Sequence, residues 1–199
     1  HVTVKLNTMV MAEMINEQNP YAVFVATGSN PIIPNIEGVS EDTIYTVEQA
    51  LSKDFKVENE KVVVIGGGMT GCEVAEDLAL KGNHVTLIEM QDKLAPEVCP
   101  DNLVTVLKNL KSCDANILLS HKMIRIDNQE IIVENMETSE TLAIPADRII
   151  LSLGGRPNDS LYNELEGQRS RVYQLGDTIK VGRIAQAVQT GFETAYVME

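Results

Sequence analysis

The amino-acid sequence predicts an α/β fold in which helices cover a parallel sheet. Short, nearly continuous apolar runs, such as those at 21–27, 61–65 and 147–153, are typical of strands that are buried on both faces. They alternate along the chain with segments of helical periodicity. Aromatic residues make up 4% of the 199 residues and tryptophan is absent, so Val, Ile, Leu, Ala and Met must supply the apolar volume. That composition suits packed layers of sheet and helix.

The first part of the chain, residues 1–56, predicts short elements separated by turns. In order, these are a strand at 2–6, a helix at 9–18 that Pro20 closes, a strand at 21–27, turns at 28–38 and a short helix at 46–52. The polar stretch KDFKVENEK follows and predicts a domain boundary, which we place between residues 56 and 57.

Residues 57–153 predict a second domain that begins with a βαβ unit. The unit has a strand at 61–65, a helix at about 69–81 and a strand at 84–89. Its helix ends before Gly82, where a glycine favours the left-handed position that closes a helix. The inner face of that helix consists of Gly71, Val74, Ala75 and Leu78. The later elements are an amphipathic helix at 100–113 and strands at 116–119, 122–126, 130–134, 140–144 and 147–153.

The last segment, residues 154–199, predicts a strand at 171–177 that ends in Gly-Asp and a closing helix at 183–198. The helix carries one apolar stripe at helical spacing. This stripe consists of Ile184, Ala187, Val188, Gly191, Ala195 and Met198.

The sequence VVVIGGGMTGCE places a Gly-x-Gly-x-x-Gly motif between a predicted strand and a predicted helix. In a dinucleotide-binding unit Gly66 makes the tight turn, Gly68 lets pyrophosphate approach the backbone, and Gly71 lets helix and strand pack closely. The phosphate then lies at the helix N-terminus, where free N–H groups and the helix dipole favour an anion. The motif predicts a Rossmann-type domain; a glycine-rich structural turn is the alternative.

The second strand of the unit ends in Glu89, eighteen residues beyond Gly71. A carboxylate there accepts hydrogen bonds from a ribose 2′-hydroxyl and repels a 2′-phosphate. Lys93 is the only cation close by in the sequence, and no arginine follows to hold such a phosphate. The pattern favours NAD(H) over NADP(H). The alternative is a solvated glutamate at a strand end.

No side chain of the sequence stands in a catalytic pattern. Glu73, in the first turns of the nucleotide helix, either borders the nicotinamide or only complements the positive end of the helix. Cys72 is expected to be a small buried apolar group. We expect no catalytic residue in the chain and no metal ligand, because the chemistry belongs to a cofactor.

The composition excludes several other functions. A net charge of −13 argues against binding of nucleic acid or of an anionic membrane surface. No apolar run approaches the roughly 20 residues that cross a bilayer, and no signal-peptide pattern is present. Three scattered cysteines without CxxC spacing argue against zinc and disulfides and favour a reducing, cytoplasmic setting.

Four segments in this order resemble the pyridine nucleotide–disulfide oxidoreductase superfamily, in which an NAD-binding domain is inserted into an FAD-binding domain. They are VFVATGSNPIIPNIEG, VVVIGGGMTGCEVAEDLALKGNHVTLIEM, IILSLGGRPN and VYQLGDTIKVGRIAQAVQTGFETAYVM. The resemblance implies that 57–153 bind NAD(H), and that 1–56 and 154–199 form an incomplete FAD-type domain. The residues expected at NAD(H) are Gly66, Gly67, Gly68, Met69, Thr70, Gly71, Glu73, Glu89, Met90 and Gly154; those expected at FAD are Ala26, Thr27, Gly28, Gly176 and Asp177.

Within the superfamily, the short stretch between Arg156 and Gly176 is most similar to the C-terminal region of Old-Yellow-Enzyme-like NADH:flavin oxidoreductases, such as 2-enoate and 2,4-dienoyl-CoA reductases. That resemblance implies hydride transfer from NADH to FAD. Electrons then pass to FMN and an iron–sulfur cluster in a separate N-terminal barrel, which reduces an activated C=C bond. Two alternatives remain: a flavin-dependent NADH oxidase or disulfide reductase, and a non-catalytic NAD(H)-binding module that senses redox state.

The first glycine motif that such proteins use for FAD does not occur before residue 20. We therefore expect this chain to be a piece of a longer polypeptide whose missing N-terminal region completes the FAD site. We also expect the piece alone to be inactive as an enzyme. Its own affinity for FAD and its oligomeric state stay open at this point.

Overall fold

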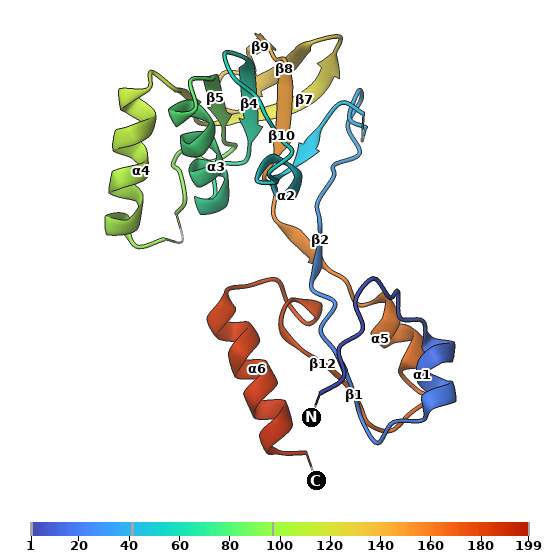
Figure 1. Ribbon diagram of the computed structural model, residues 1–199. Helices are drawn as coiled ribbons and strands as arrows, with labels where there is room; N and C mark the ends of the chain where they lie inside the picture. The colour runs from blue at the N-terminus through green and yellow to red at the C-terminus, as the bar shows by residue number, and fades with distance from the viewer. Residues whose placement is uncertain (1, 41, 97, 199) are drawn as a thin grey trace. The chain divides into compact units, whose positions relative to one another are not determined.

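The computed structural model describes residues 2–40, 42–96 and 98–198, and the chain divides into two compact units (Figure 1). Unit 1 combines residues 1–30 with 155–199, and unit 2 is the intervening segment 31–154. The α/β fold expected from the sequence is confirmed. Each unit is described by itself below.

Within the described residues, unit 2 is built on a five-stranded parallel sheet with the strand order β3-β10-β4-β5-β6. The strands are β3 (Tyr45–Thr46), β4 (Lys61–Ile65), β5 (His84–Ile88), β6 (Asn116–Leu118) and β10 (Arg148–Leu151). The central strand β4 pairs on one side with β5 and on the other with β10, which begins 87 residues after the start of β4. The glycine-rich turn that follows β4 therefore lies at the middle of the carboxyl edge of the sheet, where α/β proteins bind ligands.

Strands β4 and β10 are therefore far apart in the sequence although they are neighbours in the sheet. In the register of the two strands, Arg148 lies opposite Val62 and Leu151 lies opposite Ile65. The pairing of β4 with β10 is thus a long-range contact that closes the domain around the intervening helices and strands.

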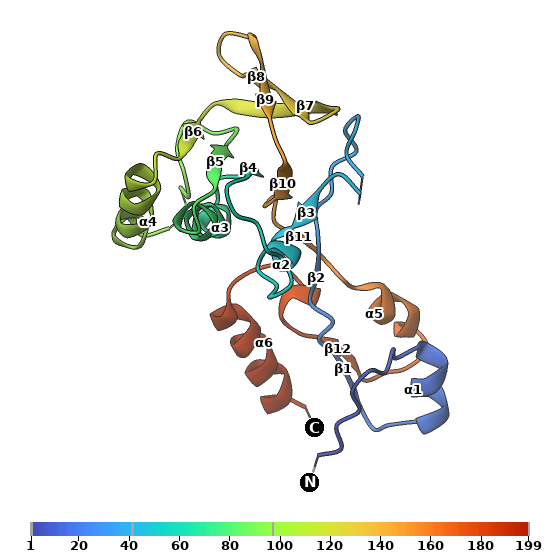
Figure 2. The same cartoon turned by 45° about the horizontal axis from the view of Figure 1, so that its top comes forward.

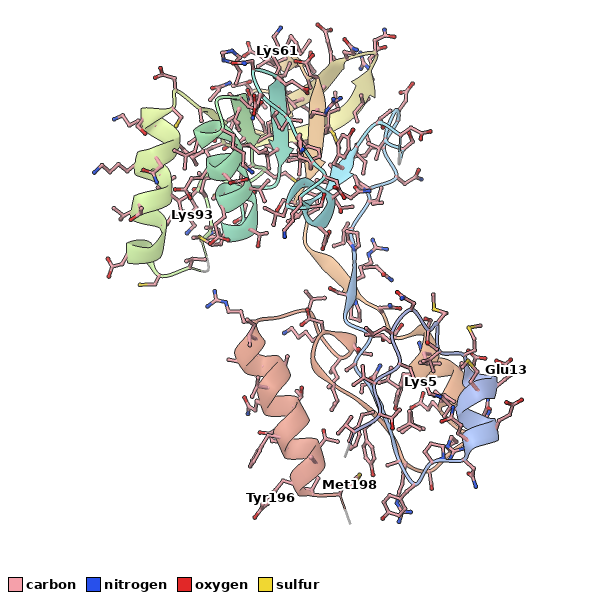
Figure 3. The ribbon with its side chains drawn as sticks, viewed as in Figure 1. Lys5, Glu13, Lys61, Lys93, Tyr196 and Met198 are labelled. Atoms are coloured by element: carbon pink, nitrogen blue, oxygen red, sulfur yellow. The ribbon has the colours of Figure 1, made fainter. Side chains whose placement is uncertain are left out.

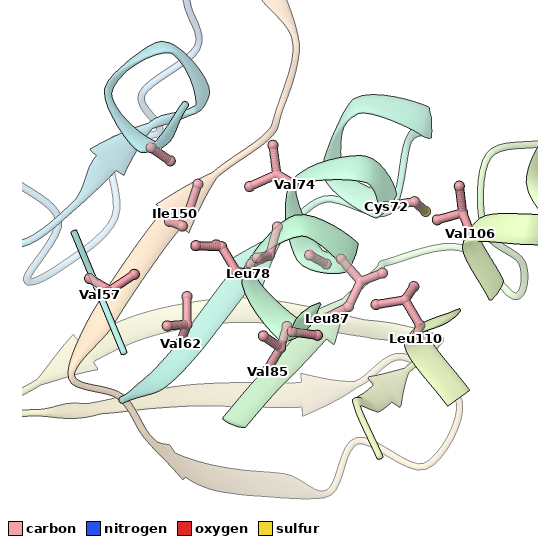
Figure 4. Packing of buried hydrophobic residues seen from close by; sticks show 14 residues of the cluster. Val57, Val62, Cys72, Val74, Leu78, Val85, Leu87, Val106, Leu110 and Ile150 are labelled. Atoms are coloured by element: carbon pink, nitrogen blue, oxygen red, sulfur yellow. The ribbon is translucent and has the colours of Figure 1, made fainter. Parts of the chain in front are cut away.

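Three helices cover one face of this sheet. They are α2 (Val47–Ala50), α3 (Met69–Leu80) and α4 (Pro100–Ser112). Val62 and Val64 of β4 belong to the apolar cluster on this side. Figure 4 shows Val62 in this cluster with Val74 and Leu78 of α3. The four residues predicted for the inner face of α3 are buried as expected; they are Gly71, Val74, Ala75 and Leu78. The burial of this face stabilises the helices against the sheet.

An antiparallel sheet of β7 (His121–Asp127), β8 (Glu130–Asn135) and β9 (Thr141–Pro145) covers the other face (Figure 2). Val63 and Ile65 of β4 alternate with the residues that face the helices, and they pack with Ile131 and Val133 of β8. Both faces of β4 are therefore buried, which explains why its sequence is a continuous apolar run rather than an alternating one.

Unit 1 contains smaller elements. They are α1 (Ala12–Gln18), β1 (Val23–Val25), β2 (Ser29–Pro31), β11 (Gly155–Pro157), α5 (Ser160–Leu165), β12 (Val172–Gln174), a 3₁₀ turn at Gly176–Thr178 and α6 (Ile184–Tyr196). Strand β1 pairs in parallel with β12, and β2, whose last residue begins unit 2, pairs with β11. The strands predicted at 21–27 and 171–177 are thus present but shorter.

The buried core of unit 1 is small. Among its described residues, only Ala12, Val25, Leu165 and Thr178 are buried. No residue of α6 is buried, although an apolar stripe is typical of a helix that packs against a core. Its large apolar side chains are exposed, and Tyr196 extends from the end of the helix (Figure 3). The stripe predicted the helix correctly but does not face a core within the described residues.

The strand predicted at 2–6 is wrong. These residues form no strand, and Val2, Val4 and Leu6 are exposed. Alternation of apolar and polar residues produces a strand only where a neighbouring strand supplies hydrogen-bond partners. No described strand pairs with this segment.

The domain boundaries predicted at residues 56/57 and 153/154 stay a prediction. By packing, residues 31–56 belong with unit 2, because β3 pairs with β10. None of the described helices is both long and apolar enough to cross a membrane.

Candidate functional site

The glycine-rich turn after β4 is held against two neighbouring strands. Gly66 has a φ of +108°, which a glycine adopts without strain. Its N–H donates to the carbonyl of Ile88 in β5 over 2.8 Å. On the other side, a side chain at Gly66 would overlap the carbonyl oxygen of Ser152. The turn therefore lies too close to β5 and β10 for any residue other than glycine.

Gly68 and Gly71 differ in what surrounds them. A side chain at Gly71 would overlap the carbonyl oxygen of Gly66, so Gly71 allows α3 to pack closely on the turn. A side chain at Gly68 would meet no protein atom within 4 Å. Space beside Gly68 is thus open on the side where the motif predicts a phosphate.

The N-terminus of α3 lies beside this open space. Gly68 is the N-cap, no side chain caps the helix, and its first turn carries no acidic residue. The first N–H groups of a helix lack partners within the helix and bind anions readily. Met69 and Thr70 form this first turn, and Glu73 follows them with an exposed side chain. The geometry fits the pyrophosphate of a dinucleotide.

Gly67 faces the protein instead. Its N–H donates to Oε2 of Glu89 over 2.5 Å. Its carbonyl accepts a hydrogen bond from the N–H of Ala95 over 2.8 Å and another from the thiol of Cys72 over 3.4 Å. The middle residue of the turn is therefore held through both its N–H and its carbonyl.

A pocket of about 180 Å³ opens next to Gly66 and Glu89. It is lined by Pro34, Ile36, Ile65, Gly66, Ile88, Glu89, Met90, His121, Lys122, Met123 and Leu153. Most of these lining residues are apolar, and Glu89 is the acidic residue among them. Such a pocket suits a flat, weakly polar ring with a hydroxyl-bearing sugar beside it.

The lysine at this pocket is paired with a carboxylate. Lys122 forms an ion pair with Glu134 at 2.9 Å. The main-chain N–H of His121 donates to the carbonyl of Glu89 over 2.9 Å. The pocket therefore holds a carboxylate and a neutralised lysine, an arrangement that gives little attraction to a further phosphate group.

Cys72 is completely buried in the core beneath the turn. Burial, and then the carboxylates of Glu89 and Glu73, raise the pKa of its thiol to about 11. Because the thiolate is the nucleophilic form, Cys72 is a neutral packing group at ordinary pH. Among the described residues no group of three or more His, Cys, Asp or Glu side chains could hold a metal ion.

A second pocket, of about 400 Å³, lies within unit 1. It is lined by Ala26, Gly28, Leu175, Gly176, Asp177, Gly182, Arg183, Ile184 and Ala187. Gly28 and Gly176 have φ values of +72° and +59°, and a side chain at Gly28 would meet no protein atom within 4 Å. Oδ1 of Asp177 accepts a hydrogen bond from the N–H of Gly182 over 3.1 Å.

Most of the residues predicted at each nucleotide lie together in their own unit. Thr27 also belongs to unit 1, but it does not line the pocket, and its hydroxyl donates to the carbonyl of Asn158. Gly154, with a φ of +79°, accepts a hydrogen bond from the N–H of Ile32 at the end of unit 2. These placements leave the binding roles of the residues as predictions.

Sequence patterns missed several residues around the site. Leu94 and Ala95 come from the loop after β5, and His121 and Lys122 come from β7. Neither segment carries a motif. Their positions follow from tertiary packing, which a local pattern does not encode.

The family described as pyridine nucleotide-disulphide oxidoreductase matches residues 16–191 of the chain. A bilirubin reductase of Mediterraneibacter gnavus is 31% identical over 199 residues, which cover 100% of this chain and 31% of that protein. A cinnamate reductase of Clostridium sporogenes is 33% identical over 201 residues, which cover 98% of this chain and 29% of that protein. The chain thus spans about 30% of the length of these relatives.

Among solved structures, 2-naphthoyl-CoA reductase in complex with 2-naphthoyl-CoA superimposes with a TM-score of 0.88 at 24% sequence identity. The match covers 98% of this chain and 29% of that chain. At this identity the likeness shows a shared fold. Together with the family match, it agrees with the resemblance that the sequence motifs indicated.

Proposed function

The chain belongs to the pyridine nucleotide-disulphide oxidoreductase family, and from this premise we propose that it binds NADH in unit 2 and part of FAD in unit 1. Bound NADH would supply a hydride and FAD would accept it. The chain's own residues bind and orient the two nucleotides. As a member of this family the chain is part of an oxidoreductase.

The observation that carries the NADH proposal is the open space at Gly68 beside the uncapped N-terminus of α3. A pyrophosphate there accepts hydrogen bonds from the N–H groups of the first helical turn. Met69, Thr70 and Gly71 belong to that turn. The packing of Gly66 and Gly71 keeps the helix close enough to the strand for this contact.

The apolar pocket beside Glu89 would take the adenosine end of the dinucleotide. Glu89 would accept a hydrogen bond from the 2′-hydroxyl of the ribose, and Met90 would border it. A 2′-phosphate would meet the negative charge of Glu89, and the lysine of this pocket is already paired with Glu134. These features support NADH over NADPH. Glu73 and Gly154 would lie toward the nicotinamide end.

The pocket in unit 1 would hold a part of FAD. Asp177 fits hydroxyl groups of the cofactor, because its Oδ1 accepts the N–H of Gly182 and each carboxylate oxygen can accept a further hydrogen bond from a hydroxyl donor. Gly28 leaves room for close approach, and Ala26 and Gly176 line the same pocket. The hydroxyl of Thr27 donates to the carbonyl of Asn158, so Thr27 would contact FAD through its own main-chain atoms.

For the longer protein we propose that electrons pass from FAD to FMN and an iron–sulfur cluster in another region, for reduction of an activated C=C bond. The relatives named cinnamate reductase and bilirubin reductase support a reductase of this kind. Cinnamate carries a C=C bond conjugated to a carboxylate. An NADH oxidase or disulfide reductase is the alternative for the electron acceptor.

The test is a calorimetric titration of the 199-residue chain with NADH, NADPH and FAD in parallel. We expect NADH to bind, NADPH to bind at least tenfold more weakly (about 1.4 kcal/mol), and FAD to bind weakly. No binding of NADH would contradict the proposal for unit 2. Equal affinity for NADPH would contradict the role of Glu89.

A further inference from the structure

The phosphate loop, residues 66–68, is held in place at its middle residue. Gly67 uses its N–H for Glu89 and its carbonyl for Ala95 and Cys72. A side chain at Gly67 would overlap Leu94 and would come within 2.8 Å of Cβ of Glu89. Protein atoms therefore surround Gly67 closely, whereas the neighbouring Gly68 has open space beside it.

Ala95 is held in an unusual backbone conformation. It is 4% exposed and has a φ of +41°, which residues other than glycine rarely adopt. Such a conformation persists where the surrounding contacts hold it. Its N–H donates to the carbonyl of Gly67, and its own carbonyl accepts a hydrogen bond from Val98 over 3.1 Å. The loop after β5 is therefore shaped to reach the glycine turn.

Glu89 connects the same two segments through its side chain. Oε2 accepts the N–H of Gly67 over 2.5 Å, and Oε1 accepts the N–H of Gln91 over 2.8 Å. Hydrogen bonds from N–H groups to a carboxylate are stronger than those between neutral groups. Each oxygen keeps a second lone pair, so the same carboxylate still accepts a bond from a ribose hydroxyl.

We propose that Glu89 and Ala95 are positioning residues that hold the phosphate loop in its binding geometry, with Glu89 acting on the pyrophosphate through Gly67 in addition to any contact with ribose. This inference rests on the proposed binding of NADH. It separates two roles of one carboxylate. If Glu89 only contacts the ribose, its substitution weakens the binding of ligands that carry the 2′-hydroxyl. If Glu89 also holds the phosphate loop in place, its substitution weakens the binding of every ligand that carries the pyrophosphate.

The test combines a substitution with a change in the ligand. Wild type and Glu89→Gln are titrated with NADH and with its analogue that has 2′-deoxyadenosine in place of adenosine. Gln has nearly the same shape as Glu, but its NH₂ group cannot accept a hydrogen bond. One of the two main-chain N–H groups, that of Gly67 or that of Gln91, therefore loses its acceptor. We expect Glu89→Gln to weaken binding of the analogue by about tenfold, the scale of one hydrogen bond to a charged group.

If Glu89→Gln binds the analogue as tightly as wild type does but binds NADH more weakly, the inference is overturned, and Glu89 acts only through its contact with the ribose. The control is Glu130→Gln at the start of β8, whose exposed carboxylate is remote from the loop in sequence. No binding of NADH by wild type would be a failure of the proposed function instead, and the following measurement would still decide the inference.

Amide exchange of Gly67 is measured by NMR without ligand. We expect it to be faster in Glu89→Gln than in wild type or Glu130→Gln, while exchange in the core of β4 is unchanged. Equal protection of Gly67 would overturn the inference. For the second tie, Ala95→Pro removes the N–H donor and excludes a positive φ, whereas Ala95→Gly keeps both. We expect only Ala95→Pro to increase exchange at residues 66–68.

Discussion

Gly71 in the first turn of α3 lies against the carbonyl group of Gly66, so that a side chain on Gly71 would overlap the carbonyl oxygen. The same side chain would lie 3.1 Å from Oγ of Ser152. Gly68, three residues earlier, has open space around it. Within one motif, Gly71 is therefore needed for the packing of the helix on the turn, whereas no packing contact requires a glycine at position 68.

This difference predicts opposite effects of two alanine substitutions. Gly71→Ala should lower the free energy of unfolding by about 1–3 kcal/mol, because the new methyl group forces the helix away from the turn. Gly68→Ala should change it by less than about 0.5 kcal/mol but should weaken NADH at least tenfold. Urea unfolding and calorimetric titration measure the two effects. Normal NADH affinity in Gly68→Ala would contradict the placement of the phosphate.

Local patterns predicted the βαβ unit well, because its information lies within neighbouring residues. The strand at 61–65 is as predicted, and the helix expected at 69–81 ends one residue earlier. The prediction failed where partners decide the outcome, as in the strand at 2–6. The same reason hid Ala95, whose positive φ no feature of the sequence LAP indicates.

Asn83 should be important for the stability of unit 2. Its buried amide donates to the carbonyls of Val57 and Leu78 and accepts the N–H of Glu60. Asn83→Ala removes the side-chain partner of the Val57 carbonyl and of the Glu60 N–H, while the Leu78 carbonyl keeps the main-chain N–H of residue 83; the loss should cost about 1–3 kcal/mol. Urea unfolding of this variant and of a control, Asn116→Ala at an exposed position in β6, measures the difference. Equal stability of the two variants would contradict the role of the buried amide.

The thiol of Cys72 should make stability depend on alkaline pH. Burial, then Glu89 and Glu73, raise its pKa from 9.0 to about 11. The unfolded chain releases this proton first, so the folded state binds more protons between these pH values. The contribution is complete below pH 9 and is lost as the pH rises toward 11.

Urea unfolding of wild type and Cys72→Ala between pH 8 and pH 11 tests this point. The titrations of lysine and tyrosine side chains are common to both proteins and cancel in the difference. We expect the advantage of wild type over Cys72→Ala to shrink as the pH rises from 9 to 11. A constant difference across this range would show that the thiol titrates equally in the folded and unfolded chain.

Unit 1 should be less stable to local opening than unit 2. Its described residues bury only four side chains, whereas β4 lies between two apolar clusters. An isolated parallel pair such as β1 with β12 has little support from burial. Local opening requires little free energy where few apolar contacts are lost. Amides of β1 and β12 should therefore exchange with solvent faster than those of β4 and β5, as measured by hydrogen exchange and mass spectrometry.

A ligand that binds unit 1 would change this order. Binding to the folded form alone stabilises it in proportion to the logarithm of the free ligand concentration. If the pocket that contains Asp177 takes part of FAD, added FAD should slow exchange in β12 and in the turn at Gly176–Thr178, while leaving β4 unchanged. NADH should slow exchange at residues 66–71 instead. Protection of both units by either nucleotide alone would contradict the assignment of one nucleotide to each unit.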